Sequence, residues 1–280
     1  MTNQLSVVVC GCTINSEKYI IKHLDHIFQL SSLFKNLDVL VYENDSADNT
    51  VAVLQKLHKE NKIKLISETG VKNKIKGRTN LIAHGRNKLL NSVRKGAYDY
   101  MIMIDMDSTL KNPIIDSVKR AFKYDTGKWD VLTGNCPNSY YDVWALRIDK
   151  KQWSPIHAKI WNLCPDYDVW DMIYHRSQMG FNETKFHIQS FQKNIHRELP
   201  LIAVNSAFNG IGIYNTTILK DCNYNGTISY CTCEKYNVQG QCYKLSCEHV
   251  SFHRDIINKN NGKIYICPSL LIPDQYEHLQ

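Results

Sequence analysis

The chain has 280 residues, 43% of them apolar and 22% charged, and its formal net charge at pH 7 is +7. These proportions are those of an ordinary globular protein, long enough to bury a full core in one domain. No stretch approaches the roughly 18 consecutive apolar residues of a membrane span, and the N-terminus has no signal-peptide pattern, so we expect a cytoplasmic protein. The moderate positive charge suits either nucleic acid or a polyphosphate-bearing substrate.

Strand and helix patterns alternate through the first 110 residues. Short apolar runs predict strands at 5–10, 37–42, 63–66 and 100–104. Amphipathic periodicity between the runs predicts helices at 20–28, 51–57 and about 79–95. Because strands that alternate with helices pair in parallel, the pattern predicts an α/β fold with a Rossmann-like, mostly parallel sheet.

The pattern beyond residue 110 is less regular. One helix is predicted at 113–122, and strands are predicted at 130–133, 201–203, 210–214 and 245–252. Residues 136–200 are rich in Trp, Tyr and His and indicate loops with short helices. We expect a single domain over residues 1–280, with a mixed, mostly parallel central sheet flanked by helices.

Two carboxylates, Asp105 and Asp107, follow the buried strand predicted at 100–104. Ligands bind at the carboxyl ends of strands in open α/β sheets. If the backbone stays extended, side chains two positions apart point to one face, and their hard oxygens favour Mg²⁺ or Mn²⁺. The alternative is a solvated turn without a metal.

An acidic turn, 43–50, follows the second strand, and a basic segment, 72–88, follows the third. An acid in the turn could accept from a nucleobase N–H or a ribose hydroxyl, while Asp48 alone suits a helix N-cap. In the basic segment Arg78 and Arg86 could meet a diphosphate at a helix N-terminus. For the four lysines we prefer a solvated loop.

The segment 247–253 holds two histidines four positions apart. In the strand predicted there, His249 and His253 share one face. One imidazole could complete a metal site begun by the two aspartates. Packed or surface histidines are the alternative.

These segments, in this order, resemble a GT-A glycosyltransferase, most closely the fungal capsule-associated α-mannosyltransferases and their microbial and viral relatives. The resemblance spans roughly residues 5–255. The segments that carry it are Tyr-Glu-Asn-Asp-Ser-Ala-Asp-Asn-Thr (42–50), His-Gly-Arg-Asn (84–87), Ile-Asp-Met-Asp (104–107), Phe-Asn-Gly-Ile-Gly-Ile-Tyr (208–214) and Cys-Glu-His-Val-Ser-Phe-His (247–253).

The resemblance implies metal-dependent transfer of a sugar from a GDP- or UDP-sugar to a glycan or glycosylated acceptor, with retention of configuration. The nucleotide-binding half is then about 1–110, the acceptor-side half about 111–255, and 256–280 is a C-terminal tail. The implied donor contacts are Glu43 to the base, Asp45 to the ribose region, Arg86 near the diphosphate, Asp105 to ribose or metal, and Asn209 with Gly210 around the donor sugar or acceptor.

The same resemblance implies a metal and a catalytic set. Mn²⁺ or Mg²⁺ is expected on Asp105 and Asp107, with His253, or failing that His249, as the C-terminal ligand. An inverting enzyme would also need a carboxylate base, and the candidates are Glu248, Asp168 and Asp171.

Ten cysteines are unexpected in a cytoplasmic chain, and five of them crowd into one segment: Cys222, Cys231, Cys233, Cys242 and Cys247. Their spacing matches no standard zinc motif. We expect free thiols; structural zinc and disulfides formed on oxidation are the alternatives.

Two other functions compete with sugar transfer. The run from Met101 to Leu110, with Asp105 and Asp107, also matches the nucleophile loop of a haloacid-dehalogenase-type phosphatase. Three strand–helix units precede it, however, and no apolar strand followed by Gly-Asp or paired aspartates lies downstream. A basic nucleic-acid-binding protein would interleave lysines with aromatics, whereas the aromatics here cluster at 140–175, where charge is mixed.

Overall fold

The computed structural model describes residues 2–106, 112–148, 154–161, 192–229 and 243–272. Its centre is an eight-stranded sheet in the order β3-β2-β1-β4-β7-β5-β10-β6. The strands of this sheet are β1 (Ser6–Thr13), β2 (Asn36–Asn44), β3 (Lys64–Glu68), β4 (Tyr100–Ile104), β5 (Val131–Asn135), β6 (Ile202–Ala203), β7 (Ile211–Asn215) and β10 (Ile264–Leu271). A small second sheet pairs β8 (Thr227–Ser229) with β9 (Tyr243–Leu245).

The strand directions confirm the predicted mixed, mostly parallel sheet. The first four strands, β1 to β4, run parallel to their neighbours among themselves. β7 runs antiparallel to both β4 and β5, so β5 and its parallel neighbour β10 point the same way as β4. The carboxyl ends of β1, β2, β4, β5 and β10 therefore share one edge of the sheet.

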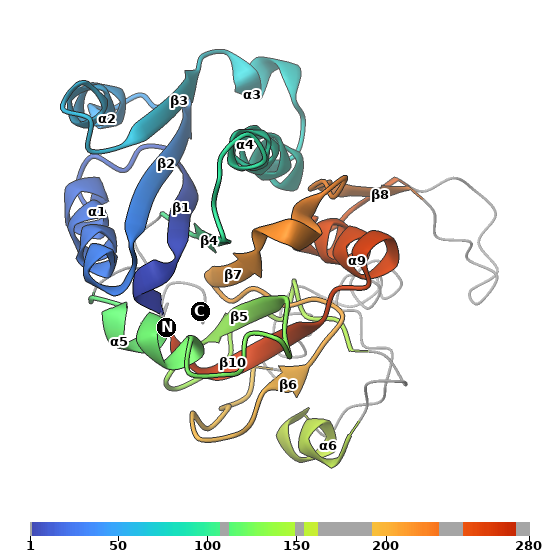
Figure 1. Ribbon diagram of the computed structural model, residues 1–280. Helices are drawn as coiled ribbons and strands as arrows, with labels where there is room; N and C mark the ends of the chain where they lie inside the picture. The colour runs from blue at the N-terminus through green and yellow to red at the C-terminus, as the bar shows by residue number, and fades with distance from the viewer. Residues whose placement is uncertain (1, 107–111, 149–153, 162–191, 230–242, 273–280) are drawn as a thin grey trace.

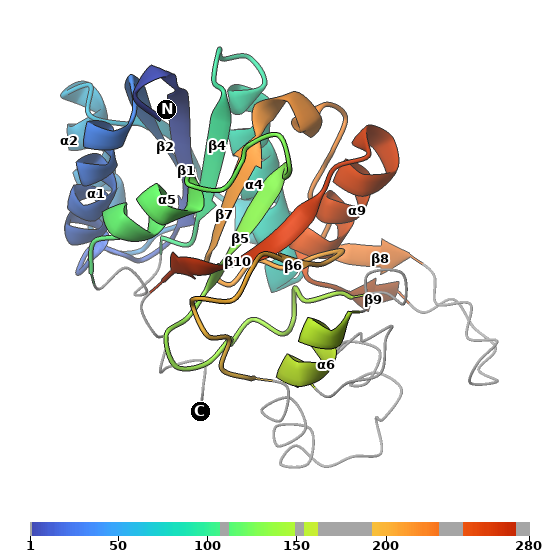
Figure 2. The ribbon, with the colours of Figure 1, turned by 60° about the horizontal axis from the view of Figure 1, so that its bottom comes forward.

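Helices cover both faces of the sheet (Figures 1 and 2). One face packs against α1 (Ile20–Phe28), α2 (Thr50–Lys59) and α5 (Ile115–Ala121). The other packs against α4 (Arg78–Val93) and α9 (Glu248–Asn260). The shorter helical segments are η1 (Thr2–Gln4), η2 (Gln29–Leu33), α3 (Val71–Lys74), α6 (Pro155–Trp161) and η3 (Thr216–Leu219).

The central strand β4 shows why these residues form a buried strand. All five of its residues are buried, and its side chains alternate between the two faces. Met101 and Met103 join the core beneath α4 and α9, whereas Ile102 and Ile104 join the core beneath α1 and α5. Full burial of one such side chain contributes about 1.5–3 kcal/mol, so the strand is held from both faces.

Two sequence predictions near the C-terminus are wrong. The strand predicted at 245–252 is largely the helix α9, which begins at Glu248. His249 and His253 still share a face there, because side chains four positions apart are neighbours on a helix. The tail predicted at 256–280 contains the end of α9 and the whole of β10, which lies between β5 and β6 in the main sheet.

In the described part of the chain, every helix is too short or too polar to pass through a lipid bilayer.

Candidate functional site

A cavity of about 580 Å³ opens at the carboxyl ends of β1, β2 and β4, and we call it the edge cavity. Ligands bind at this kind of edge in open α/β sheets. The residues that line it are Cys12, Thr13, Ile14, Asn15, Tyr19, Tyr42, Asn44, Lys72, Ile75, Lys76, Gly77, Arg78, Leu81, Ile82, Arg86, Asp105 and Met106. Four cationic side chains against one carboxylate make the cavity suited to an anionic ligand.

Arg86 of α4 is the buried charge of the site, with 5% of its surface exposed. Its Nη2 donates to Oδ1 of Asp105 at 2.8 Å, and its Nη1 donates to Oε1 of Glu248. Nη1 also contacts Nε2 of His249. Burial alone would lower the pKa of Arg86, but the two carboxylates outweigh burial and raise it. The guanidinium is therefore a permanent positive charge that joins α4, β4 and α9.

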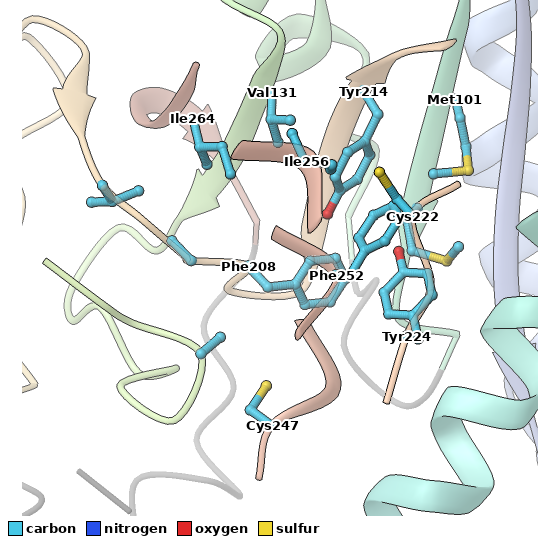
Figure 3. Packing of buried hydrophobic residues seen from close by; sticks show 14 of the residues in the cluster. Met101, Val131, Phe208, Tyr214, Cys222, Tyr224, Cys247, Phe252, Ile256 and Ile264 are labelled. Atoms are coloured by element: carbon cyan, nitrogen blue, oxygen red, sulfur yellow. The ribbon is translucent and has the colours of Figure 1, made fainter. Parts of the chain in front are cut away.

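Aromatic rings and close backbone packing hold Arg86 in place. Its Cζ lies 4.7 Å from the ring centre of Phe208 and 5.8 Å from that of Tyr224. Both rings belong to the buried cluster drawn in Figure 3. A Cβ at the preceding Gly85 would lie 2.5 Å from the ring of Tyr42, so α4 could not approach the sheet this closely with any other residue there.

Asp105 lies at the end of β4, as predicted. Its backbone N–H donates to the carbonyl oxygen of Gly210 at 3.0 Å, and its side chain is 29% exposed beside the cavity. The chain just after it is held against β1, because Oγ1 of Thr13 donates to the carbonyl of Met106 at 3.2 Å. Asp107, Asp168 and Asp171 lie outside the described residues.

Glu43, predicted to contact a base, is buried and directed at its own turn. Its Oε1 accepts from the backbone N–H of Ser46 at 2.9 Å, and its Oε2 accepts from the hydroxyl of Ser67 at 2.6 Å. Glu43 does not line the edge cavity, whereas its neighbour Asn44 does. A direct contact between Glu43 and a ligand would require these hydrogen bonds to break.

Asp45, predicted at the ribose, holds the loop before α3. It accepts from the backbone N–H groups of Gly70 and Lys72, the latter at 2.8 Å, and from Nδ2 of Asn44 at 3.1 Å. These bonds, first among them the one from Lys72, lower the pKa of Asp45. Asp45 itself does not line the cavity, but Lys72 does. Asp45 therefore holds in place a segment that lines the cavity.

The other residues of the acidic turn form hydrogen bonds with the loop after β1. Asp48 accepts from the backbone N–H of Thr50 at 3.0 Å, at the start of α2, and from that of Glu17 at 3.1 Å. Asn15 donates its backbone N–H to Ser46 Oγ at 3.0 Å, and its Oδ1 accepts from the N–H of Ala47 at 2.7 Å. The turn therefore carries the hydrogen bonds that shape the cavity.

Asn209 and Gly210 form a buried turn beside the strand ends. Asn209 and Asp142 bond reciprocally: Asp142 Oδ2 accepts from the N–H of Asn209 at 3.1 Å, and Asn209 Oδ1 accepts from the N–H groups of Tyr141 and Asp142, each at 3.2 Å. Burial raises the pKa of Asp142. Neither Asn209 nor Gly210 lines the edge cavity, and Gly210 contacts the site through its carbonyl, which accepts from the N–H of Asp105.

The two histidines of α9 are fully buried and differ in their partners. His253 has hydroxyls at both ring nitrogens, Ser206 Oγ at Nδ1 and Tyr214 Oη at Nε2, each at 3.0 Å. His249 stacks on Phe208 with ring centres 3.7 Å apart, and its Nδ1 has no hydrogen-bond partner among the described residues. Burial lowers the pKa of both rings, so both are neutral.

The described part of the chain contains no group of three or more His, Cys, Asp and Glu side chains that could hold a metal ion. A metal bond from His253 would break one of its hydroxyl contacts, and Nε2 of His249 faces the Arg86 guanidinium. His253 of the predicted metal set therefore does not fit this arrangement, whereas Nδ1 of His249 is left without a partner among the described residues. The carboxylate of Asp105, partly exposed beside the cavity, does fit a hard cation.

Sequence reasoning missed several residues of the cavity. Thr13 ends β1, and Asn15 and Tyr19 follow it; their only signal was a position at the end of a parallel strand. Lys72 and Lys76 were expected in a solvated loop, yet both line the cavity. Of the five clustered cysteines, Cys222 and Cys247 are buried free thiols, and the other three lie outside the described residues.

Comparison with known proteins identifies one family and a shared fold. Residues 6–179 match the family model described as glycosyl transferase family 2. The fold is similar to that of the mannosyltransferase PcManGT from Pyrobaculum calidifontis, solved with GDP-Man and Mn²⁺, at 13% identity and a TM-score of 0.50 over 97% of this chain. S. aureus TarS 1–349, solved with UDP-GlcNAc, is similar at 16% identity and a TM-score of 0.47 over 97% of this chain.

The chain spans 57% of the PcManGT chain and 59% of the TarS chain. It has no match among curated protein sequences.

Proposed function

Since the chain belongs to glycosyl transferase family 2, we propose that it transfers a sugar from a nucleotide-sugar donor held in the edge cavity to a glycan or glycosylated acceptor. The observation that carries this proposal is the buried Arg86 joined to Asp105 at the mouth of a cationic cavity on the carboxyl edge of the sheet. A glycosyltransferase needs a fixed positive charge there, because the leaving nucleoside diphosphate gathers negative charge.

We place the nucleoside end of the donor against the β1 and β2 strand ends. Asn15 and Asn44 line this part of the cavity, and their side-chain amides can donate to and accept from a base edge. Tyr19 lines the same part and offers a ring for stacking. Glu43 and Asp45 act in this proposal through the loops that they hold, in place of the direct contacts expected from the sequence.

We place the diphosphate end toward Arg78 and Arg86, which also line the cavity. Guanidinium groups bind phosphate oxygens with paired hydrogen bonds, which fixes orientation as well as charge. We propose that Asp105 and Asp107 hold a divalent cation, Mn²⁺ or Mg²⁺, which when bound would neutralise further charge on the leaving group. The PcManGT structure named above contains Mn²⁺ together with GDP-Man, and this supports the proposal.

In the reaction the bond between the anomeric carbon and the diphosphate oxygen breaks, a bond from the acceptor oxygen forms, and the proton of the acceptor hydroxyl passes to an oxygen of the leaving diphosphate. Arg86 stabilises the departing diphosphate, and Glu248 orients Arg86. Of the three candidate bases, Glu248 alone lies within the described residues, and its carboxylate is held by that guanidinium. We therefore assign Glu248 a positioning role. Retention of configuration, which the resemblance of the sequence implies, stays a prediction that proton NMR of the product anomer tests.

A thermal-shift panel of UDP- and GDP-sugars, with and without Mn²⁺, tests the donor and the metal together. We expect one base class to raise the melting temperature, and Mn²⁺ to increase that shift. The variant Arg86→Lys should lose most of the shift, whereas Lys95→Ala, which removes an exposed charge outside the cavity, should keep it. Equal melting temperatures with every nucleotide sugar would reject the proposed donor site.

Family membership decides between the two enzymes considered from the sequence, because the run at 101–110 lies inside a glycosyltransferase domain and not in a phosphatase. The narrower resemblance to the fungal capsule-associated enzymes, and the expected lack of nucleic-acid binding, stay predictions. A gel shift at low salt tests the latter, and a retarded band with random-sequence RNA would contradict it.

A further inference from the structure

A second hollow, of about 410 Å³, lies on the α5 side of the sheet and shares no residue with the edge cavity. We call it the α5 hollow. It is assembled from three separate parts of the chain, namely the end of α5 with the turn after it, the segment before β6, and β10. The residues that line it are Arg120, Lys123, Tyr124, Arg197, Glu198 and Ser269.

The charges of the α5 hollow do not balance. Three cations face one carboxylate, that of Glu198, which accepts from Nε of Arg197 at 3.0 Å. This ion pair joins two adjacent, exposed residues and therefore contributes little to the stability of the fold. Arg120 and Lys123 make no ion pair with any described residue. The hollow therefore has two positive charges without an ion-pair partner among the described residues, which suits a ligand carrying about two negative charges.

Helix electrostatics explains only part of this cluster. Lys119 and Arg120 lie in the last turn of α5, where positive side chains complement the helix dipole. The dipole accounts for a cation at position 120, but not for Lys123 beyond the helix or for Arg197, some 75 positions further along the chain. Chain segments far apart in the sequence thus bring their positive side chains to one hollow.

Hydroxyl groups complete a set of donors in the hollow. Tyr124 and Ser269 both line the hollow, and burial raises the pKa of Tyr124, so its phenol keeps the proton that it can donate. Two guanidinium groups, an ammonium and two hydroxyls match the oxygens of a phosphate group, which arginine binds through paired hydrogen bonds. The hollow is larger than one phosphate and can accept the organic group attached to it.

The hollow adjoins the carboxyl end of β5. Nδ2 of Asn135, the last residue of β5, donates to the carbonyls of Ile195 at 2.8 Å and Pro268 at 3.0 Å. These two residues lie close in sequence to Arg197 and Ser269, so Asn135 ties two walls of the hollow to the sheet.

We propose that the α5 hollow binds the phosphate group of a phosphorylated ligand, at a site separate from the edge cavity. The proposal does not depend on the proposed function, because no residue is shared between the two sites. The phosphate could belong to a soluble sugar or polyol phosphate or to a lipid headgroup, and both sources present the same group to the same side chains.

Isothermal titration calorimetry with glycerol 3-phosphate tests the proposal on the full chain. We expect the double variant Arg120→Ala/Lys123→Ala to bind it about tenfold or more weakly than the wild type. The matched control Lys95→Ala/Lys119→Ala removes the same charge from exposed positions outside the hollow and should bind within about twofold of the wild type. Circular dichroism confirms that each variant is folded.

Sedimentation with phosphatidylcholine vesicles, with and without phosphatidic acid, identifies the source of the phosphate. If phosphatidic acid vesicles sediment the wild type and not the double variant, the ligand is a lipid headgroup; if glycerol 3-phosphate alone discriminates, it is soluble. Either result supports the site. Equal binding by wild type and double variant in both assays, or equal loss in the matched control, would overturn it.

Discussion

The carbonyl oxygen of Gly210 accepts a hydrogen bond from the backbone N–H of Asp105, with 3.0 Å between nitrogen and oxygen. This bond extends the antiparallel pairing of β4 with β7 by one step beyond Ile104 and Ile211. Asn209 and Gly210, the two residues before β7, have left-handed backbones, with φ of 56° and 83°. The position of the Asp105 carboxylate thus depends on a turn more than 100 residues away in sequence.

Replacing Gly210 with Ala tests this dependence. A side chain at φ 83° is strained, so we expect a loss of about 1–2 kcal/mol in the free energy of unfolding and weaker donor binding as Asp105 shifts. Urea denaturation and donor titration measure the two effects. Gly127→Ala, at a surface glycine where a Cβ would come no closer than 3.4 Å to another atom, is the control and should change neither quantity. Normal donor affinity in Gly210→Ala would contradict the positioning role.

Substitutions of Arg86 and Glu248 separate positioning from proton transfer. Arg86 uses different nitrogens for Asp105 and Glu248, a bridge that one ammonium cannot make, so Arg86→Lys should lower kcat/KM by roughly 10²–10³. Arg86→Ala should cost about 3–5 kcal/mol of stability, because it leaves the Glu248 carboxylate buried without its counter-charge. Urea denaturation and steady-state kinetics measure these losses.

Glu248→Gln decides the role of Glu248 itself. An amide can still accept from Arg86, so we expect kcat to stay within about tenfold of the wild type and the donor KM to rise. Loss of a general base would instead lower kcat by roughly 10²–10⁴ with little change in KM. A kcat loss of that size would return Glu248 to the list of catalytic bases.

The sequence predicted the first half of the fold better than the end of it. The strands 37–42 and 100–104 are fully or largely buried apolar runs, and such short runs are compatible with few structures other than a buried strand. The segment 245–252 was too short to distinguish the two-residue period of a strand from the 3.6-residue period of a helix. Its apolar residues Val250 and Phe252 lie two positions apart, as they would on one face of a strand. The helical signal needed a longer window, because the buried face of α9 includes His249, Phe252, His253 and Ile256, at spacings of three and four.

The site was predicted in its location but only partly in its contacts. Asp105 and Arg86 meet because the carboxyl end of a parallel strand and the helix beside it are fixed by the topology. The roles of Glu43 and Asp45 depended on which N–H groups lie within reach, and Gly70 and Lys72 come close only in the folded turn. Periodicity and motif order contain no information about such side-chain to backbone bonds.

Asp45→Ala tests the loop that Asp45 holds. Without an acceptor for the N–H groups of Gly70 and Lys72, the cavity wall that includes Lys72 should loosen. We expect the donor KM to rise roughly tenfold with kcat little changed, the size of one lost charge-assisted hydrogen bond. Steady-state kinetics over a range of donor concentrations measures both constants. The control Asp125→Ala lies in a surface turn outside the cavity and should behave as the wild type. A fall in kcat with unchanged KM would instead implicate Asp45 in the chemical step.

His23, on α1, gives the protein a pH-dependent stability. It does not line the edge cavity, although its ring centre lies 5.1 Å from that of Tyr19, which does. Burial, with the nearby positive charges of His26 and Lys22, lowers its pKa to about 4, and its Nδ1 has no hydrogen-bond partner in the described part of the chain. The unfolded chain binds a proton at this ring near pH 6.5 and the folded chain does not until about pH 4.

The stability that the neutral ring provides is therefore complete above pH 6.5 and is lost as the pH falls toward 4. The loss is about 1.4 kcal/mol per pH unit in that window, seen as a lower urea midpoint at pH 5 than at pH 7. His23→Gln cannot take up the proton, so its urea midpoint should change less between the two pH values. His196→Gln, at an exposed position, should keep the wild-type dependence. If His23→Gln and the wild type lose equal stability over this interval, the proton is taken up at another group.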